Sequence, residues 1–172
     1  MQDPRYLELM TLIGNMYPDD VNLILSQYGY PVSLSAALAA GATQTLQLQI
    51  QGTSDFLVTG LYVRAGVANA AQTVSTQTAP MVRTLITDAG TNNQFTSGPV
   101  DIMNLATNAA SAASRSFPWP RLVRGRTTLT ITHTSYAAAE SYNPLDLFFE
   151  GIQILAMPRV AGSVDQRMRW AT

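Results

Sequence analysis

The side chains that could take part in chemistry are few, and the sequence keeps them apart. His133 is the only histidine and the chain has no cysteine, so the ligands of a typical zinc site are missing. His133 alternates with Leu129 and Ile131 on one face of an expected strand, which indicates a histidine in the core or at an interface. A catalytic triad would have to be built around this one imidazole.

The carboxylates form no catalytic or metal-binding pattern either. Asp19 and Asp20 could bind calcium, but adjacent acidic residues at an expected helix start more often interact with the helix dipole. Asp146 and Glu150 flank Phe148 on one strand face, which is too sparse a pattern for a glycosidase pair. No glycine spacing resembles a phosphate-binding loop or a dinucleotide fingerprint. We therefore predict a protein that is not an enzyme and that needs no cofactor or metal.

Composition favours a protein that is held in an assembly. Only 12% of the 172 residues are charged, and all ten basic residues are arginines, whereas about a quarter of a typical soluble protein is charged. A surface of neutral hydrogen-bonding groups such as Thr, Gln and Ser costs less to desolvate against another protein than a surface of Lys and Glu. The net charge of −1 argues against a nucleic-acid binder. No apolar run approaches the roughly 20 residues of a membrane span.

The first thirty residues have helical periodicity. After a candidate N-cap at Asp3, apolar residues recur at helical spacing at Tyr6, Leu9, Met10, Ile13 and Tyr17. A second helix from Pro18 to a cap at Gly29 fits the pattern that follows. The alternation of Val21, Leu23 and Leu25 is the competing indication, and it favours a strand.

From Thr43 onward the apolar residues alternate with period two, as in half-buried strands. This pattern predicts strands at 43–51, 56–64, 81–87, 127–134 and 145–157, with short strands at 94–97 and 100–105. A bulge or bend is expected at Gly60, and a turn after Asp88. In the last strand Leu145, Leu147 and Phe149 occupy odd positions, and Ile152 and Ile154 even ones. A bulge at Glu150–Gly151 would restore a common inward face.

These elements predict an all-β fold, a jelly-roll or Greek-key β-sandwich of about six to eight strands with a short N-terminal helical arm. We expect long loops at 66–80 and 108–116 and an extended course for Phe117–Pro120. Three parts are predicted: an N-terminal arm over residues 1–30 with one or two short helices, a sandwich over 31–158 and a C-terminal tail over 159–172.

Three segments are candidates for an assembly interface. The apolar side of the arm could dock on a neighbouring subunit or cap its own sandwich. The arginine cluster could contact an acidic partner or be solvated. The tail contains Arg and Trp, two residue types that are enriched in interfaces. The Phe117–Pro120 stretch could be a peptide ligand or a rigid crossover. The candidate residues are Tyr6, Leu9, Met10 and Ile13 in the arm, Arg121, Arg124 and Arg126 in the cluster, and Arg167, Arg169 and Trp170 in the tail.

Two segments, Leu122–Thr132 and Tyr142–Ile154, carry a resemblance to the jelly-roll proteins of tailed-bacteriophage virions. The first is a Thr-rich strand preceded by glycine, and the second is an aromatic strand that ends in a glycine bulge. The resemblance extends over about Thr43 to Met157 and leaves the arm unmatched. It implies a capsid decoration, or cement, protein on the outside of a phage head, with the major capsid protein as partner. We expect a homo-oligomer, a dimer or trimer, because closed symmetry lets one surface patch satisfy itself.

Two other classes of function stay open at this point. One is a different virion component, such as a tail, connector or head-fibre protein with the same sandwich. The other is a carbohydrate-binding sandwich, for which Trp119 or Tyr142–Asn143 would supply the aromatic platform. No specific nucleic acid and no membrane is expected as a partner.

Overall fold

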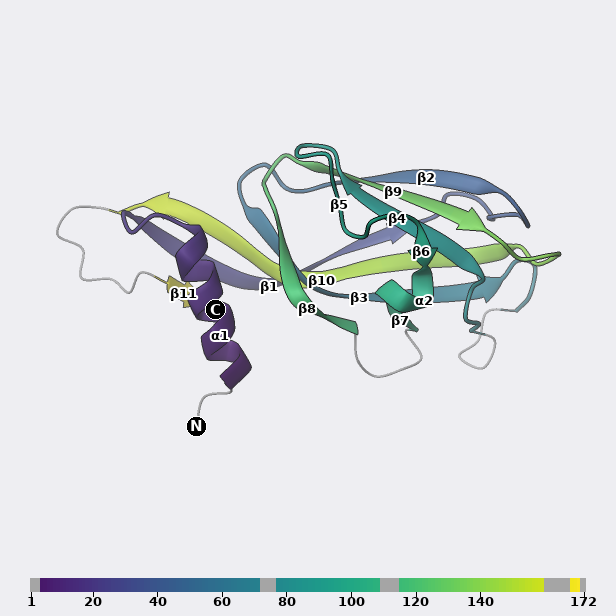
Figure 1. The fold of residues 1–172 in the computed structure, drawn as a ribbon, viewed down its shortest axis with the longest axis horizontal. Coiled ribbons are helices and arrows are strands. Elements are labelled where there is room, and N and C mark those ends of the chain that lie inside the picture. The colour runs from purple at the N-terminus through teal and green to yellow at the C-terminus, as the bar shows by residue number, and fades with distance from the viewer. Residues whose placement is uncertain (1–3, 72–76, 109–114, 160–167, 171–172) are drawn as a thin grey trace.

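Alternating polar and apolar residues form two β-sheets that pack face to face as a sandwich (Figure 1). The computed structural model describes residues 4–71, 77–108, 115–159 and 168–170. The first sheet contains β1 (Val21–Ser33), β3 (Asp55–Val67), β7 (Thr107–Asn108), β8 (Arg115–Val123), β10 (Tyr142–Pro158) and β11 (Met168–Trp170). The second contains β2 (Thr43–Gln49), β4 (Val82–Asp88), β5 (Asn93–Gln94), β6 (Val100–Asp101) and β9 (Thr128–Ser135). The two helices are α1 (Pro4–Met16) and α2 (Ile102–Leu105).

The chain crosses repeatedly between the two sheets. The first sheet has the order β11-β1-β10-β3-β7, with β8 also paired to β3, and the second has the order β2-β9-β4-β5, with β6 also paired to β4. Most strands that are neighbours in a sheet are therefore distant in sequence, apart from β4 and β5, and most pairs are antiparallel. The predicted all-β sandwich is confirmed. Within the part of the chain that the structure describes, no helix is long and apolar enough to cross a membrane.

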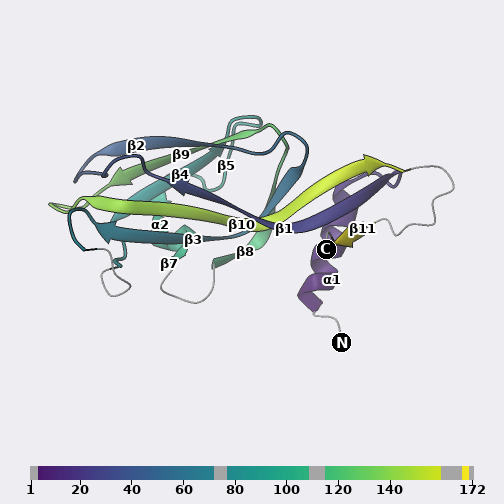
Figure 2. The ribbon, with the colours of Figure 1, turned by 180° about the vertical axis from the view of Figure 1, so that it is seen from behind.

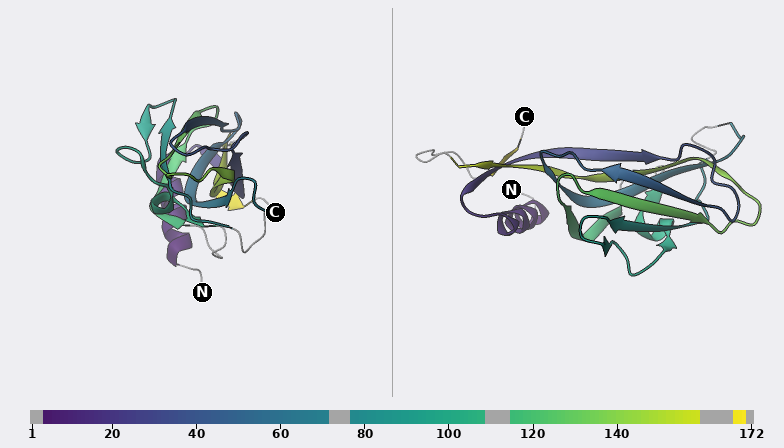
Figure 3. Two further views of the ribbon diagram at one scale, coloured as in Figure 1. Left: turned by 90° about the vertical axis from the view of Figure 1, so that its right-hand side faces the viewer. Right: turned by 90° about the horizontal axis from the view of Figure 1, so that it is seen from above.

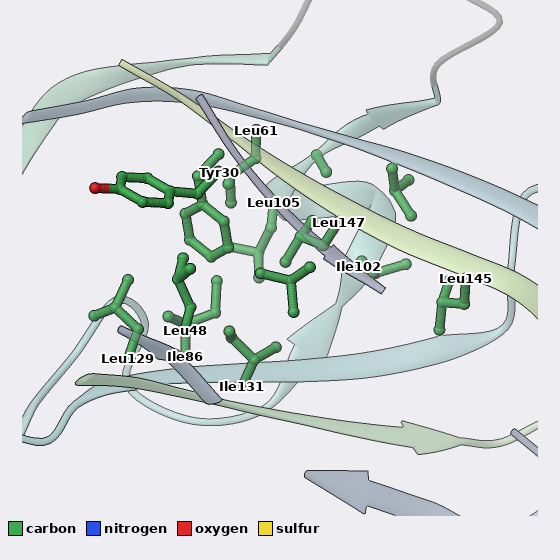
Figure 4. Close-up of a cluster of buried hydrophobic side chains, with 14 of the residues drawn as sticks. Tyr30, Leu48, Leu61, Ile86, Ile102, Leu105, Leu129, Ile131, Leu145 and Leu147 are labelled. Carbon is green, nitrogen blue, oxygen red and sulfur yellow. The ribbon is translucent and has the colours of Figure 1, made fainter. Parts of the chain in front are cut away.

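The main core lies between the two sheets (Figure 4). The second sheet supplies inward side chains such as Leu129 and Ile131, and the first sheet supplies Leu147 and Phe149 from β10. Tyr30 packs edge-to-face on Phe56, with ring centroids 4.9 Å apart. Because Leu129 and Ile131 alternate with threonines along β9, the period-two pattern of this strand becomes an apolar face turned toward the opposite sheet.

A second apolar cluster lies outside the sandwich, on the other face of the first sheet. β1 and β10 pair without interruption from Val21↔Pro158 to Ser33↔Asp146, and their outer ends project beyond the second sheet, where α1 and β11 lie (Figures 1 and 2). The view from above in Figure 3 shows the elongated body that results. This cluster is made of Ile13, Leu23, Leu25, Leu57, Ile152 and Ile154.

In both β1 and β10, therefore, one face is covered by the second sheet along part of the strand, and the opposite face is covered by the second cluster along the rest. Tyr30 and Phe149 face the second sheet, whereas Leu25 and Ile154 belong to the cluster under α1. The register of β3 with β10 does shift between Glu150 and Gly151, so the predicted irregularity is present. The prediction that this irregularity gives β10 a common inward face was wrong. Ile152 and Ile154 remain on the face opposite to Leu147 and Phe149.

Three further sequence expectations need correction. The second helix is wrong: residues from Val21 onward form β1, which also crosses the boundary expected at residue 30. Asp19 and Asp20 therefore precede a strand and do not begin a helix. Residues 102–105 form α2, where a strand was expected.

Most of the other local predictions are confirmed. A register shift lies at Gly60 in the pairing of β3 with β8, and Asp88 Oδ1 accepts hydrogen bonds from the backbone N–H groups of Gly90 and Thr91, 2.8 and 3.3 Å away. Phe117–Pro120 is extended within β8. The expected loop at 66–80 overlaps the end of β3, and its residues 72–76 lie outside the described part, as do 109–114 of the second expected loop.

His133 is a histidine of the core, one of the two environments predicted for it. Its side chain is 0% exposed, and Nδ1 lies 2.8 Å from the hydroxyl of Thr84 on β4. Burial lowers the pKa of the imidazole to about 4, because the charged form would lose its hydration without gaining a counterion. The native protein therefore holds His133 neutral.

We expect the protein to lose up to about 3 kcal/mol of stability as the pH falls from about 6.5 to about 4. In this window the unfolded chain binds a proton at His133 and the native chain does not, so acid favours unfolding. Urea unfolding of the protein and of His133→Gln at stepped pH would measure the difference. Parallel loss of stability in both proteins would show that the neutral imidazole is not the cause.

Candidate assembly interface

The predicted arm is a helix that packs on its own chain. Ile13 is 0% exposed in the second cluster, and Leu9 and Met10 are partly buried against the same residues. The arm therefore covers its own sheet, and docking on a neighbouring subunit stays a prediction. Leu7 is 51% exposed on the same helix. Tyr6 lies within α1, but its side chain is outside the described part.

Arg124, one of the three clustered arginines, is engaged within the chain. Its Nη1 donates to Asp55 Oδ2 at 2.7 Å, and its guanidinium carbon lies 5.5 Å from the centre of the Tyr17 ring. The same carboxylate accepts a hydrogen bond from the Tyr17 hydroxyl at 2.6 Å and from the Gly125 N–H at 2.8 Å. Asp55 thus joins the segment after α1, the start of β3 and the turn after β8.

The environment of Asp55 keeps the carboxylate charged. Partial burial alone would raise its pKa, but the hydrogen bonds from Tyr17, Gly125 and Arg124 hold the pKa below its usual value. Burial, followed by the hydrogen bond to Asp55, raises the pKa of the Tyr17 hydroxyl, so it stays a donor. This centre was not predicted from the sequence, because an isolated acid at a strand start carries no motif. The only signal was the pair of arginines around Gly125.

The other two arginines of the cluster remain directed outward. Arg121 and Arg126 are both exposed, and among the described residues the only salt bridge is that of Arg124 with Asp55. Arg126 has a φ of 67° in the turn that leads into β9. These two guanidinium groups could therefore contact an acidic neighbour without first breaking a salt bridge described here.

The tail returns to the first sheet. β11 pairs in parallel with β1, with Leu23 opposite Met168 and Leu25 opposite Trp170. Trp170 is partly buried against the second cluster, so its ring helps to cover the chain's own apolar face. Arg167 and the side chain of Arg169 lie outside the described part.

The outward face of the second sheet carries an uncharged ladder along β2 and β9. Every outward residue of the two strands is Thr or Gln, and each lies opposite another member in the register of the strands. The hydroxyls of Thr43 and Thr134 are 3.0 Å apart, and those of Thr45 and Thr132 are 3.3 Å apart. The ladder consists of Thr43, Thr45, Gln47 and Gln49 on β2 and Thr128, Thr130, Thr132 and Thr134 on β9.

The described residues bring no cluster of three or more His, Asp or Glu side chains together that could hold a metal. Tyr142, one of the aromatics considered for carbohydrate binding, is 0% exposed, and its hydroxyl accepts a hydrogen bond from the Met81 N–H at 3.0 Å. Its ring is therefore not available as a platform. The side chain of Trp119 lies outside the described part. No protein-family model, curated protein or solved structure matches the chain.

Proposed function

We propose that the protein is a capsid decoration protein, which binds the outside of a phage head and stabilises the shell through contacts with the major capsid protein. The observation that carries this proposal is the uncharged ladder on β2 and β9. Thr and Gln side chains can exchange hydrogen bonds with water for hydrogen bonds with a partner, and no charge has to be desolvated. Such a surface suits a permanent contact better than a freely diffusing enzyme.

The proposed mechanism is mechanical. Buried side chains fill the sandwich core at one end of the elongated body and the second cluster at the other, and a subunit packed in this way and attached at two places would transmit tension between them. The exposed Arg121 and Arg126 offer bidentate contacts to acidic groups of the shell. Each contact of standard size buries about 1,600 Å² in total, and repetition over the shell raises the effective concentration of every further contact.

Binding to empty heads tests this proposal. Heads assembled from the major capsid protein of the same virion, without this chain, would be titrated with the purified protein and sedimented. We expect saturable binding at a fixed number of copies for each head, and a higher temperature of head rupture once the sites are full. The double variant Arg121→Ala/Arg126→Ala should bind more weakly while its unfolding temperature stays unchanged.

Other outcomes of the same titration would assign the protein to a different part of the virion or contradict the proposal. Binding restricted to purified tails or connectors would assign the protein to another part of the virion. No saturable binding to any of these particles would contradict a structural role in the virion.

A further inference from the structure

Most strand edges of the sandwich are protected against pairing with another chain. Short edge strands, prolines and charged residues are the usual protective devices. β5, β7 and β11 have two or three residues each. β8 contains Pro118, Pro120 and Arg121, and β1 carries Pro31 in the part that lies beyond its pairing with β11.

β2 lacks all of these devices. It is a seven-residue strand, Thr43–Gln49, with no charged residue, no proline and no glycine. In the described part of the chain it pairs with β9 alone, without a register shift. β2 is therefore a regular, neutral edge of the kind that natural sandwiches rarely leave uncovered.

The free side of β2 presents a complete set of backbone donors and acceptors. The N–H of Ser135 donates to the carbonyl of Ala42, and the N–H of Ile50 donates to the carbonyl of Thr127, both at 2.9 Å. The even-numbered residues of β2 therefore bond to β9. Because bonding direction alternates along an antiparallel strand, the odd-numbered residues direct their N–H and C=O groups to the free edge. These residues are Thr43, Thr45, Gln47 and Gln49, and their side chains are exposed.

We propose that β2 pairs antiparallel with β2 of a second copy of this chain, about a twofold axis at Leu46. This inference rests on the proposed assembly role and deepens it, because it names the surface and the partner of the homo-oligomer. Centred on Leu46, the pairing places Thr43 opposite Gln49 of the second copy and Thr45 opposite Gln47 of the second copy. All four outward-bonding residues then find partners, and the two second sheets join into one continuous sheet.

A second copy fits this edge because the strand is complementary to itself. Antiparallel pairing of identical strands has twofold symmetry, the commonest symmetry of homo-oligomers. No like charges meet, since β2 has none, and each cross-strand pair on the outer face joins a Thr to a Gln. Leu46 is only partly buried in the single chain. It would lie opposite its own copy at a non-hydrogen-bonded position, where Cα atoms are about 4.5 Å apart.

Sedimentation of the full chain, with Thr45→Pro as the disruptive variant, tests the pairing. Proline removes an N–H that points to the free edge and leaves the bonds to β9 in place. We expect the unsubstituted protein to form a reversible dimer, and Thr45→Pro to weaken it by about tenfold or more. Circular dichroism would establish that the variant remains folded.

A cross-linking pair tests the register independently, because the chain has no cysteine of its own. Leu46→Cys should oxidise to a disulfide-linked dimer, since a Cα separation of about 4.5 Å lies within the range of disulfides. Leu48→Cys, on the same face of the same strand, would lie opposite Gln44 of the second copy and should not cross-link.

Three results would overturn the inference: a monomeric unsubstituted protein, a dimer that survives in folded Thr45→Pro, or equal cross-linking of Leu46→Cys and Leu48→Cys. If Thr45→Pro does not fold, the cysteine pair decides alone. A dimer that does not bind to phage heads would support this inference and contradict the proposed function. Head binding by a monomer would do the opposite.

Discussion

Gly151→Ala is expected to lower the free energy of unfolding by about 3 kcal/mol or more, a large effect for one added methyl group. Gly151 lies where β10 passes β3 at the register shift. A β-carbon there would overlap the carbonyl oxygen of Leu57 and lie 2.8 Å from Cζ of Phe56. Neither neighbour can move freely, because Leu57 is part of the sheet backbone and Phe56 is fully buried.

Urea unfolding would measure this loss, provided that the m-value is the same for the variant and the unsubstituted protein. Gly98→Ala is the matched control, since a β-carbon at Gly98 meets nothing within 4 Å. We expect the control to change stability by less than about 0.5 kcal/mol. Equal stability of the two variants would mean that β10 does not approach β3 as closely as the structure shows.

Ile13→Asp is expected to release α1 from the first sheet. Ile13 is 0% exposed among Leu23, Leu25 and Ile152, so the substitution removes about 2–5 kcal/mol of apolar packing and would bury a carboxylate without a partner. Because α1 packs on the cluster outside the sandwich core, we expect a local loss. The helix should lose its protection from hydrogen exchange while the strands of the sandwich keep theirs.

Leu7→Asp is the matched control for this prediction, because Leu7 lies on the same helix and is 51% exposed. Limited proteolysis should cleave Ile13→Asp within residues 4–16 and spare the control. If the two variants are cleaved alike, the apolar cluster does not hold the helix.

The sequence predicts the sandwich well where one face of a strand is covered along its whole length. In β9, Leu129 and Ile131 face the core and the threonines between them face outward along the whole strand. The alternation in β2 and β9 therefore predicts these strands correctly. The turn after Asp88 and the irregularity at Gly60 were predictable for local reasons, a side-chain acceptor and a missing side chain.

Two of the errors, those in β1 and β10, lie where the covered face of the strand changes. In β1, Leu23 and Leu25 face α1, and Tyr30 and Val32 face the second sheet. A strand that changes its covered face loses period two over a short window and can imitate helical spacing, which explains the wrong second helix. The same change in β10 shifts the apolar residues from odd to even positions, which was interpreted as a bulge that restores a common inward face. Which face is covered depends on α1, a contact that local periodicity does not contain.

The candidate interface stays a prediction, because interface composition and core composition overlap and the sequence does not separate them. Ile13 and Trp170 are apolar or aromatic for the benefit of their own chain, and Arg124 is held by Asp55. What distinguishes a surface for a partner is exposure combined with unused bonding capacity. Only the three-dimensional arrangement reveals that combination for β2.

The most direct test of the proposed role is a reconstruction by cryo-electron microscopy of phage particles assembled with this chain. We predict density for the elongated sandwich at symmetry-related positions on the outer surface of the head, with the ladder of β2 and β9 covered by a neighbouring subunit. A head whose outer surface shows no such density, in particles proven to contain the chain, would contradict the proposed role.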